Sequence, residues 1–494
     1  MLWGRRRTLT AAITATTLTA VLLLTGCSAQ VDAGSAGAVE AERELSGIDG
    51  VRSVRGSGTN NLPFAGTVSV VVTADDDLSD AQLLRVTHEV GRWIADASGQ
   101  GTTYSGSMEA DGFDFPVRRH ASENEELLSV VDRFRGDDRW LGGRVSAPEP
   151  SGTGGGRIAL AVRHPGDLVR GWEAVRKTMA SSGWETATAS ASWWQTPPEE
   201  RLPSDDAELQ ITDHVPGSDD TVGDPSVEIA AYERVTAAHE VTRASVAPGR
   251  IHLHLTDLDD VRDATALARQ AAPDAQVIVD GGIVTKDVPQ GDDDLPDAAD
   301  YDEADRLAAV AVRPGVTAVS VTPTGLRVTV DDPDEVLATA TALAAAAPAD
   351  PVTSIRVGPQ EAADGAGDAA DQDIASNADR LSVSGSPEML DASIQVGTQL
   401  RGFPPASSEQ FDTNESVAAT LSDVEQVPAF VEALRPVLPD GTGLHVRLAG
   451  RGTGGTTQLT LRNGVLTAEP LRNGEERGTD RTDLERALQD AWNR

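Results

Sequence analysis

The chain has 494 residues, with 78 acidic and 41 basic side chains and a formal net charge of −37. An acidic surface of this kind repels nucleic acid phosphates and anionic lipid headgroups, which excludes nucleic acid as a partner. The single cysteine excludes internal disulfides and zinc sites built on several cysteines. The length predicts several domains, at roughly 100–200 residues each.

The N-terminus has the pattern of an export signal. Three arginines at 5–7 precede an apolar to neutral stretch over 9–24, which is too short for the roughly 20 strongly apolar residues of a membrane span. The sequence Leu-Thr-Gly-Cys over 24–27 ends this stretch and resembles the lipobox of bacterial lipoproteins. That resemblance implies cleavage between Gly26 and Cys27 and acyl chains on Cys27, which hold the mature chain on the extracytoplasmic face of the cell membrane.

Beyond a leash rich in Ser, Ala and Gly, a pattern of apolar strand, acidic turn, amphipathic helix and second strand recurs along the chain. Strands of this kind begin at residues 67, 157, 251, 326 and near 416, a spacing that predicts duplicated small units. We therefore expect a mixed α/β (α+β) fold of tandem helix–strand–strand–helix–strand units, joined by acidic linkers with proline and glycine.

Two of these units share a further motif. Gly-Val-x-x-Val introduces a strand at 50–54 and again at 315–319, each time after a predicted helix, over 38–46 and 302–312. This order loosely resembles the BON-type domains of bacterial envelope proteins, most closely over 300–358. The resemblance implies a small α/β unit with a membrane-proximal binding role and no enzymatic activity.

The linkers set the predicted boundaries along the chain. The expected organisation is a signal peptide over 1–26, a flexible leash over 27–38, α/β units over 39–120, 121–195, 225–286, 300–358 and 416–494, an acidic linker over 196–224 and a largely disordered linker over 359–415.

Helix starts are marked by capping residues. Ser79-x-x-Gln82 predicts a capping box, and Asp332 before Pro333 predicts an N-cap followed by a proline in the first turn. The aspartate clusters at 75–77, 257–260 and 331–334 lack the spacing of an EF-hand loop, so we interpret them as helix caps and not as calcium ligands.

Local signatures of catalysis are absent from the sequence. It contains no Gly-x-Ser-x-Gly, Ser-x-x-Lys, His-Glu-x-x-His or phosphate-binding Gly-Lys-Ser/Thr motif. An enzyme with dispersed residues stays open as an alternative, and it would need one of four histidines to meet an acid in space: His88, His120, His164 and His214. We expect no cofactor.

Two pairs of side chains are candidates for binding. His252 and His254 share one face of a strand, at a spacing that zinc or copper accepts, although two solvent-facing histidines are the simpler interpretation. Trp193 and Trp194 point to opposite faces of their strand, so one of them is expected at the surface, where it could stack on a sugar or a partner protein.

These features together predict a non-enzymatic binding or scaffold lipoprotein of the bacterial cell envelope. Its membrane contact is through Cys27, and its partner is an envelope protein or glycan. The main alternative is a solute- or glycan-binding lipoprotein with a cleft between units, and the other is the dispersed-site enzyme.

Overall fold

The computed structural model describes residues 33–62, 65–99, 101–148, 156–184, 188–195, 207–214, 222–287, 301–346, 352–359, 381–403, 405–411, 414–449, 456–468 and 479–494. The predicted signal peptide and Cys27 lie outside these residues. The chain divides into two compact units. Unit 1 holds residues up to Glu233 together with Thr242–Ile251, and unit 2 holds Arg234–Val241 and His252–Arg494.

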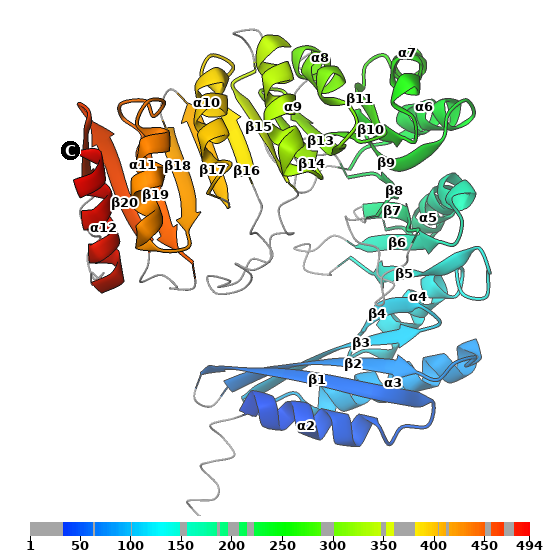
Figure 1. Ribbon diagram of the computed structural model, residues 1–494. Coiled ribbons are helices and arrows are strands. Elements are labelled where there is room, and N and C mark those ends of the chain that lie inside the picture. Colours follow the sequence, from blue (N-terminus) through cyan, green and yellow to red (C-terminus); the bar gives the residue numbers. More distant parts are fainter. Residues whose placement is uncertain are drawn as a thin grey trace, which may run out of the picture. The chain divides into compact units, whose positions relative to one another are not determined.

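The elements of unit 1 alternate between helices and pairs of strands (Figure 1). They are α2 (Ala33–Leu45), β1 (Val51–Leu62), β2 (Ala65–Ala74), α3 (Asp80–Ala97), β3 (Thr102–Ala110), β4 (Phe113–Val117), α4 (Ala121–Val131), β5 (Trp140–Ser146), β6 (Arg157–Val162), α5 (Leu168–Ser182), β7 (Thr188–Trp193), β8 (Leu209–Thr212), α6 (Ser226–Thr236) and β9 (Val241–Ala247).

Unit 2 continues the alternation; the division between the units falls within α6, β9 and β10. Its further elements are β10 (Arg250–Leu255), α7 (Val261–Ala271), β11 (Gln276–Gly281), β12 (Val284–Lys286), α8 (Asp302–Ala311), β13 (Val316–Thr322), β14 (Gly325–Val330), α9 (Pro333–Ala346), β15 (Ser354–Pro359), β16 (Leu381–Gly385), α10 (Leu390–Leu400), β17 (Ala406–Phe411), β18 (Asn414–Leu421), α11 (Val427–Leu434), β19 (Gly443–Leu448), β20 (Thr456–Arg462), β21 (Val465–Ala468) and α12 (Thr479–Trp492).

One repeat, a helix followed by a β-hairpin, builds both units, so the predicted mixed α/β class is confirmed. The two strands of a hairpin pair antiparallel, as β1 with β2 and β13 with β14. The next helix then carries the chain across to a strand that pairs parallel with the hairpin's second strand, as β2 with β3 and β14 with β15. A parallel pair needs such a crossover, because its strands run in the same direction.

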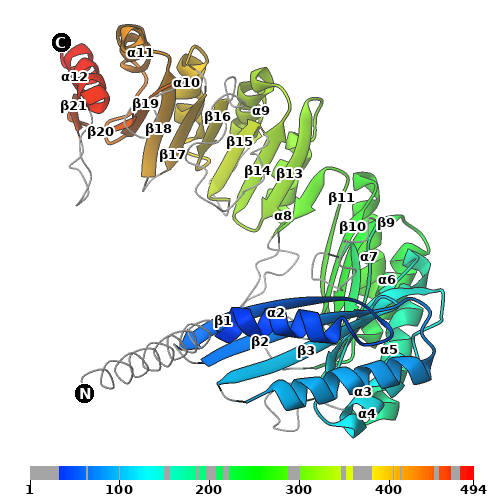
Figure 2. The same ribbon diagram turned by 90° about the horizontal axis from the view of Figure 1, so that it is seen from below.

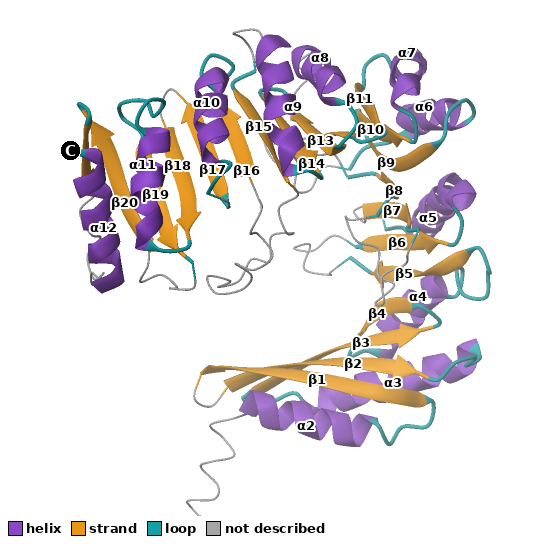
Figure 3. Cartoon of the chain, in the orientation of Figure 1, coloured by secondary structure: helices purple, strands orange, loops and turns teal. Residues whose placement is uncertain are grey.

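The helices of unit 2 cover one face of its strands (Figure 3). On β14, Leu326, Val328 and Val330 are buried toward the helices, whereas Arg327 and Thr329 alternate with them on the other face. The apolar core therefore lies between the strands and the helices, and the opposite strand face carries polar side chains.

In unit 1, α2 packs closely on β1 and β2 (Figure 2). The contact depends on glycines: a Cβ added at Gly58 would lie 2.1 Å from the carbonyl oxygen of Gly34, and one at Gly34 would lie 2.6 Å from that of Thr59. No larger residue fits at either glycine without moving the backbone. Since α2 begins at Ala33, the predicted leash over 27–38 is wrong for its last six residues.

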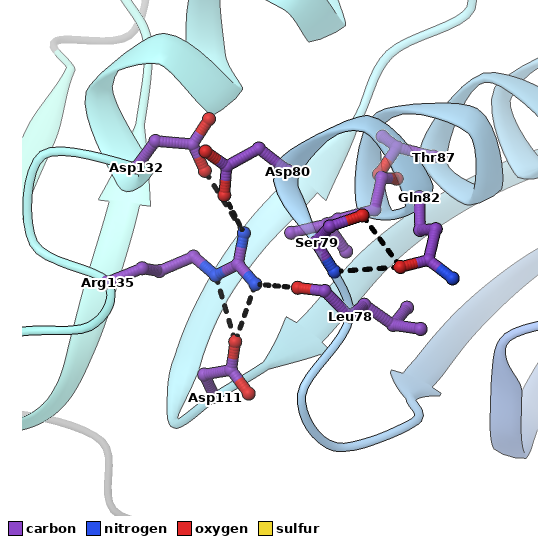
Figure 4. A network of polar contacts seen from close by, with 9 residues as sticks. Leu78, Ser79, Asp80, Gln82, Thr87, Asp111, Asp132 and Arg135 are labelled. Carbon is purple, nitrogen blue, oxygen red and sulfur yellow. Dashed lines mark hydrogen bonds and ion pairs between the residues drawn. The ribbon is translucent and has the colours of Figure 1, made fainter.

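A polar network around Arg135 joins several elements of unit 1 (Figure 4). The Arg135 side chain is 7% exposed; its Nε and Nη2 donate to Asp111 Oδ2 at 2.9 and 2.7 Å. Nη1 donates to Asp80 and Asp132, both at 3.1 Å, and Nη2 also donates to the Leu78 carbonyl at 2.8 Å. The guanidinium thus ties the start of α3, the β3–β4 turn and the end of α4 together.

Two of the predicted helix caps are confirmed. At the start of α3 the Ser79 backbone N–H donates to Gln82 Oε1 at 3.0 Å, and Asp332 accepts from the Asp334 N–H at 2.9 Å before α9. The cluster at 75–77 is different: Asp77 has a positive φ of 61° in the turn before Ser79, and Asp76 pairs with Arg52. These aspartates stabilise the turn, and Ser79 provides the cap.

A two-residue turn closes the C-terminal hairpin. Asn463 and Gly464 connect β20 to β21 with φ angles of 51° and 75°. Positive φ at both central residues is what a two-residue type I′ turn requires.

The predicted linkers are wrong in part. Residues 381–411 of the expected disordered linker form β16, α10 and β17, and residues 209–212 of the expected acidic linker form β8. The five predicted units also differ from the two observed ones, because strands pair across the expected boundaries. β12 pairs with β13, and β15 pairs with β16.

Candidate functional site

Unit 2 contains a cleft of about 910 Å³ between α7 and α8. Val277 and Val279 on β11 and Val284 on β12 form its floor. Helices α8 to α12 each pack against the next helix, and the cleft lies where α7 precedes this run. Its volume falls within the range of small-molecule sites, which are typically apolar hollows with a few polar groups.

The two walls of the cleft carry opposite charges. Arg262 and Arg269 project from α7, and Asp302 and Asp305 project from α8; the exposed Asp259, in the short turn before α7, also lines the cleft. Within the part of the chain that the structure describes, Arg262, Arg269 and Asp302 form no ion pair with another described side chain. Their charges are therefore available to a bound molecule.

Below the walls, the buried carboxylate of Asp280 forms a compact polar centre. Asp280 is the penultimate residue of β11 and is 2% exposed. It accepts from His252 Nε2 at 3.1 Å, from His254 Nδ1 at 2.6 Å and from the Lys286 backbone N–H at 2.5 Å. Burial alone would raise the pKa of Asp280, but these hydrogen bonds outweigh it and lower the pKa to about 2.

A partly buried ion pair lies beside Asp280. Lys286 Nζ contacts Asp305 Oδ2 at 2.7 Å, and the Lys286 side chain is 8% exposed. The ammonium also lies 5.4 Å from the centre of the Tyr301 ring. Burial raises the pKa of Asp305 against the opposing effect of Lys286. This pair connects β12 with α8 at the base of the anionic wall.

His252 and His254 lie together as the sequence predicts, and both turn toward Asp280. Among the described residues, no group of three or more His, Cys, Asp or Glu side chains is arranged to hold a metal ion. The two histidines therefore act as hydrogen-bond donors to the one carboxylate of Asp280. Asp280, Lys286 and Asp305 were not predicted from the sequence; a charged residue directly after the apolar run 277–279 was the available signal.

The two tryptophans lie in unit 1 and do not line the cleft. Trp193 is partly exposed at the end of β7, and Trp194 is 6% exposed. Trp193 is therefore the member of the pair that is accessible at the surface.

Of the four histidines considered for a dispersed active site, His88 has a described acidic neighbour. Its Nε2 lies 3.8 Å from Glu125 Oε1 and 3.2 Å from the Ala121 carbonyl, at the surface between α3 and α4. His120 and His164 precede α4 and a short 3-10 turn, and His214 follows β8. They come from different elements of unit 1 and do not form one described cluster.

No protein-family model, curated protein or solved structure matches this chain, so its function is inferred from its own residues. In the part of the chain that is described, no helix has the length and apolar character that crossing a membrane requires.

Proposed function

We propose that the chain is an extracytoplasmic binding protein of the bacterial cell envelope, tethered to the cell membrane through acyl chains on Cys27. The lipobox-like sequence over 24–27 supports the tether. The cleft in unit 2, with an apolar floor and oppositely charged walls, is the observation that carries the binding role.

A non-enzymatic role fits the groups at this site. The polar centre offers the Asp280 carboxylate, which is 2% exposed and already accepts three hydrogen bonds, and a lysine that is paired with Asp305. A general base needs an open lone pair beside a reacting proton, and a nucleophile needs an adjacent base. These residues stabilise the structure around the cleft, and they provide neither a general base nor a nucleophile.

A scaffold role is the second candidate, and it is favoured by the strand face opposite the helices. In unit 1, exposed small polar side chains pair in register across strands, as Thr67 with Thr103 and Ser69 with Ser105. A face of this kind suits an extended envelope protein or glycan held by many weak hydrogen bonds.

The tether is tested by mass spectrometry of the N-terminus of the native protein extracted from membranes. We expect a chain that begins at an acylated Cys27, and a Cys27→Ser variant that stays unprocessed. An unmodified Cys27 or an intact residue 1 in the native protein would refute the tether.

The cleft is tested by affinity capture from envelope extract with the tethered chain. Ala266 is exposed on α7 and lines the cleft, so Ala266→Trp should fill it; Ala345→Trp, on the exposed side of α9, is the matched control. We expect Ala266→Trp to lose bound molecules that Ala345→Trp retains. Identical captures by both variants would place the binding surface elsewhere and favour the scaffold role.

A further inference from the structure

We propose that the cleft between α7 and α8 binds a short zwitterionic peptide that carries an apolar side chain. This inference rests on the proposed binding function and names the class of ligand. The ligand's carboxylate would contact the α7 wall, its ammonium group the α8 wall, and its apolar side chain the valine floor.

The α7 wall is suited to a carboxylate. Arg262 and Arg269 are seven residues apart, which is two helical turns, so their side chains leave the same face of α7 at a separation of about 10 Å. A guanidinium binds a carboxylate through two parallel hydrogen bonds, which gives orientation as well as attraction. Both arginines are exposed, so a ligand can reach them from solvent.

The α8 wall is suited to an ammonium group. Asp302 is exposed in the first turn of α8, whereas Asp305 is neutralised by Lys286 at 2.7 Å. One carboxylate on α8 is thus left for a cation. An extended peptide advances about 3.3 Å per residue, so the two charged ends of a tripeptide lie about 10 Å apart.

The residues that line the cleft favour a peptide over other classes of ligand. Val277, Val279 and Val284 line the floor and are 2–4% exposed, and none of the described residues that line the cleft is aromatic. Sugars are commonly held by stacking on aromatic rings, so the lining does not favour a glycan. The carboxylates of Asp302 and Asp305 would repel a polyanion. A purely apolar ligand would gain no binding energy from the charges on the two walls.

The experiment is calorimetric titration of the full mature chain in detergent with three probes: Gly-Leu-Gly, its N-acetyl form and its C-terminal amide. Each blocked probe loses one charge and keeps the leucine. We expect each blocked probe to bind about tenfold more weakly, as the loss of a charge-assisted hydrogen bond implies.

Variants assign each end of the peptide to a wall. The double variant Arg262→Gln/Arg269→Gln should bind Gly-Leu-Gly and its amide equally, and Asp302→Asn should bind Gly-Leu-Gly and its N-acetyl form equally. Arg92→Gln, on the exposed side of α3 in unit 1, should leave all three affinities unchanged.

The outcomes separate the ligand class from the binding function. Equal affinity for all three probes, or no binding of Gly-Leu-Gly at millimolar concentration, would overturn the peptide proposal. If the Ala266→Trp variant still loses molecules captured from envelope extract, the cleft remains the binding site and only the ligand class is wrong.

Discussion

The Arg135 network of unit 1 and the Asp280 centre of unit 2 each hold one poorly exposed charge among several hydrogen-bonding partners. The two charges have opposite signs. In the first, a cation that is 7% exposed is shared by Asp80, Asp111 and Asp132. In the second, an anion that is 2% exposed is shared by His252 and His254 together with a backbone N–H.

The difference lies in what surrounds each centre. The donors of Arg135 are taken by partners from neighbouring elements, and the guanidinium stays charged at every accessible pH. Asp280 depends on two half-buried histidines, and it lines a cleft whose walls keep available charges. The first centre is built for stability, and the second stabilises a site that is still open to a ligand.

Removing the cation should have the largest effect. Arg135→Ala leaves three carboxylates facing one another, so we expect the free energy of unfolding of unit 1 to fall by about 3 kcal/mol. Urea titration followed by tryptophan fluorescence measures it, because most described tryptophans lie in unit 1. Arg92→Ala, at an exposed position, is the control. An equal loss of unfolding free energy in both variants would show that Arg135 contributes no more to stability than an exposed arginine does.

Removing the anion should have the next largest effect and a distinct pH dependence. Because the folded-state pKa of Asp280 is about 2, below its ordinary 3.8, the ionised carboxylate stabilises the fold above pH 4. That contribution is about 2 kcal/mol and is lost as the pH falls from about 4 to 2. Asp280→Asn should remove this part of the acid sensitivity, measured as unfolding free energy against pH.

Asp305→Asn is the matched control, with the opposite sign. Burial raises the folded-state pKa of Asp305, so its protonation adds stability as the pH falls and offsets part of the loss at Asp280. Its removal should make the acid-induced loss steeper. Parallel profiles for the parent and both variants would contradict the two assigned pKa directions.

Removing one donor should have a smaller effect than removing the anion. His252→Ala deletes one of the hydrogen bonds to Asp280, so we expect about 1 kcal/mol of lost stability and a higher pKa for Asp280. Carboxyl NMR titration reads the pKa directly. His445→Ala, on β19 of the same unit, should leave it unchanged, and an unshifted Asp280 pKa in His252→Ala would contradict the centre as described.

The smallest effect should come from the helix cap beside the Arg135 network. Gln82→Ala loses the bond from the Ser79 N–H, which should cost about 0.5–1 kcal/mol. Gln82→Glu keeps an acceptor and should retain the stability. A loss as large as that of Arg135→Ala would mean that the cap and the network act as one unit.

The sequence predicts elements wherever apolar periodicity is strong. The α3 face that contains Leu83, Val86 and Val90 is buried as expected, and the caps before α3 and α9 locate their starts. β17 was missed because its core-facing positions include Ser408 and Gln410, both 0% exposed, so the strand lacks apolar alternation. Because Ser408 and Gln410 are polar although they are buried, the sequence there was interpreted as a linker and not as a strand.

The candidate site was predictable only in fragments. Strand periodicity places His252 and His254 on one face, but Asp280 joins them through a sheet contact between distant residues. The cleft depends on which helices pack together, and neither spacing nor composition encodes that for a single sequence. The proposed tether is the reverse case, since it rests on a local motif alone.

The most direct test of the central claim is hydrogen–deuterium exchange of the full mature chain with and without Gly-Leu-Gly. Slower exchange is expected in α7, β11 and β12, with no change around Arg135. Protection confined to unit 1 or to the strand face opposite the helices, with α7 unaffected, would contradict the claim that the cleft in unit 2 is the binding site.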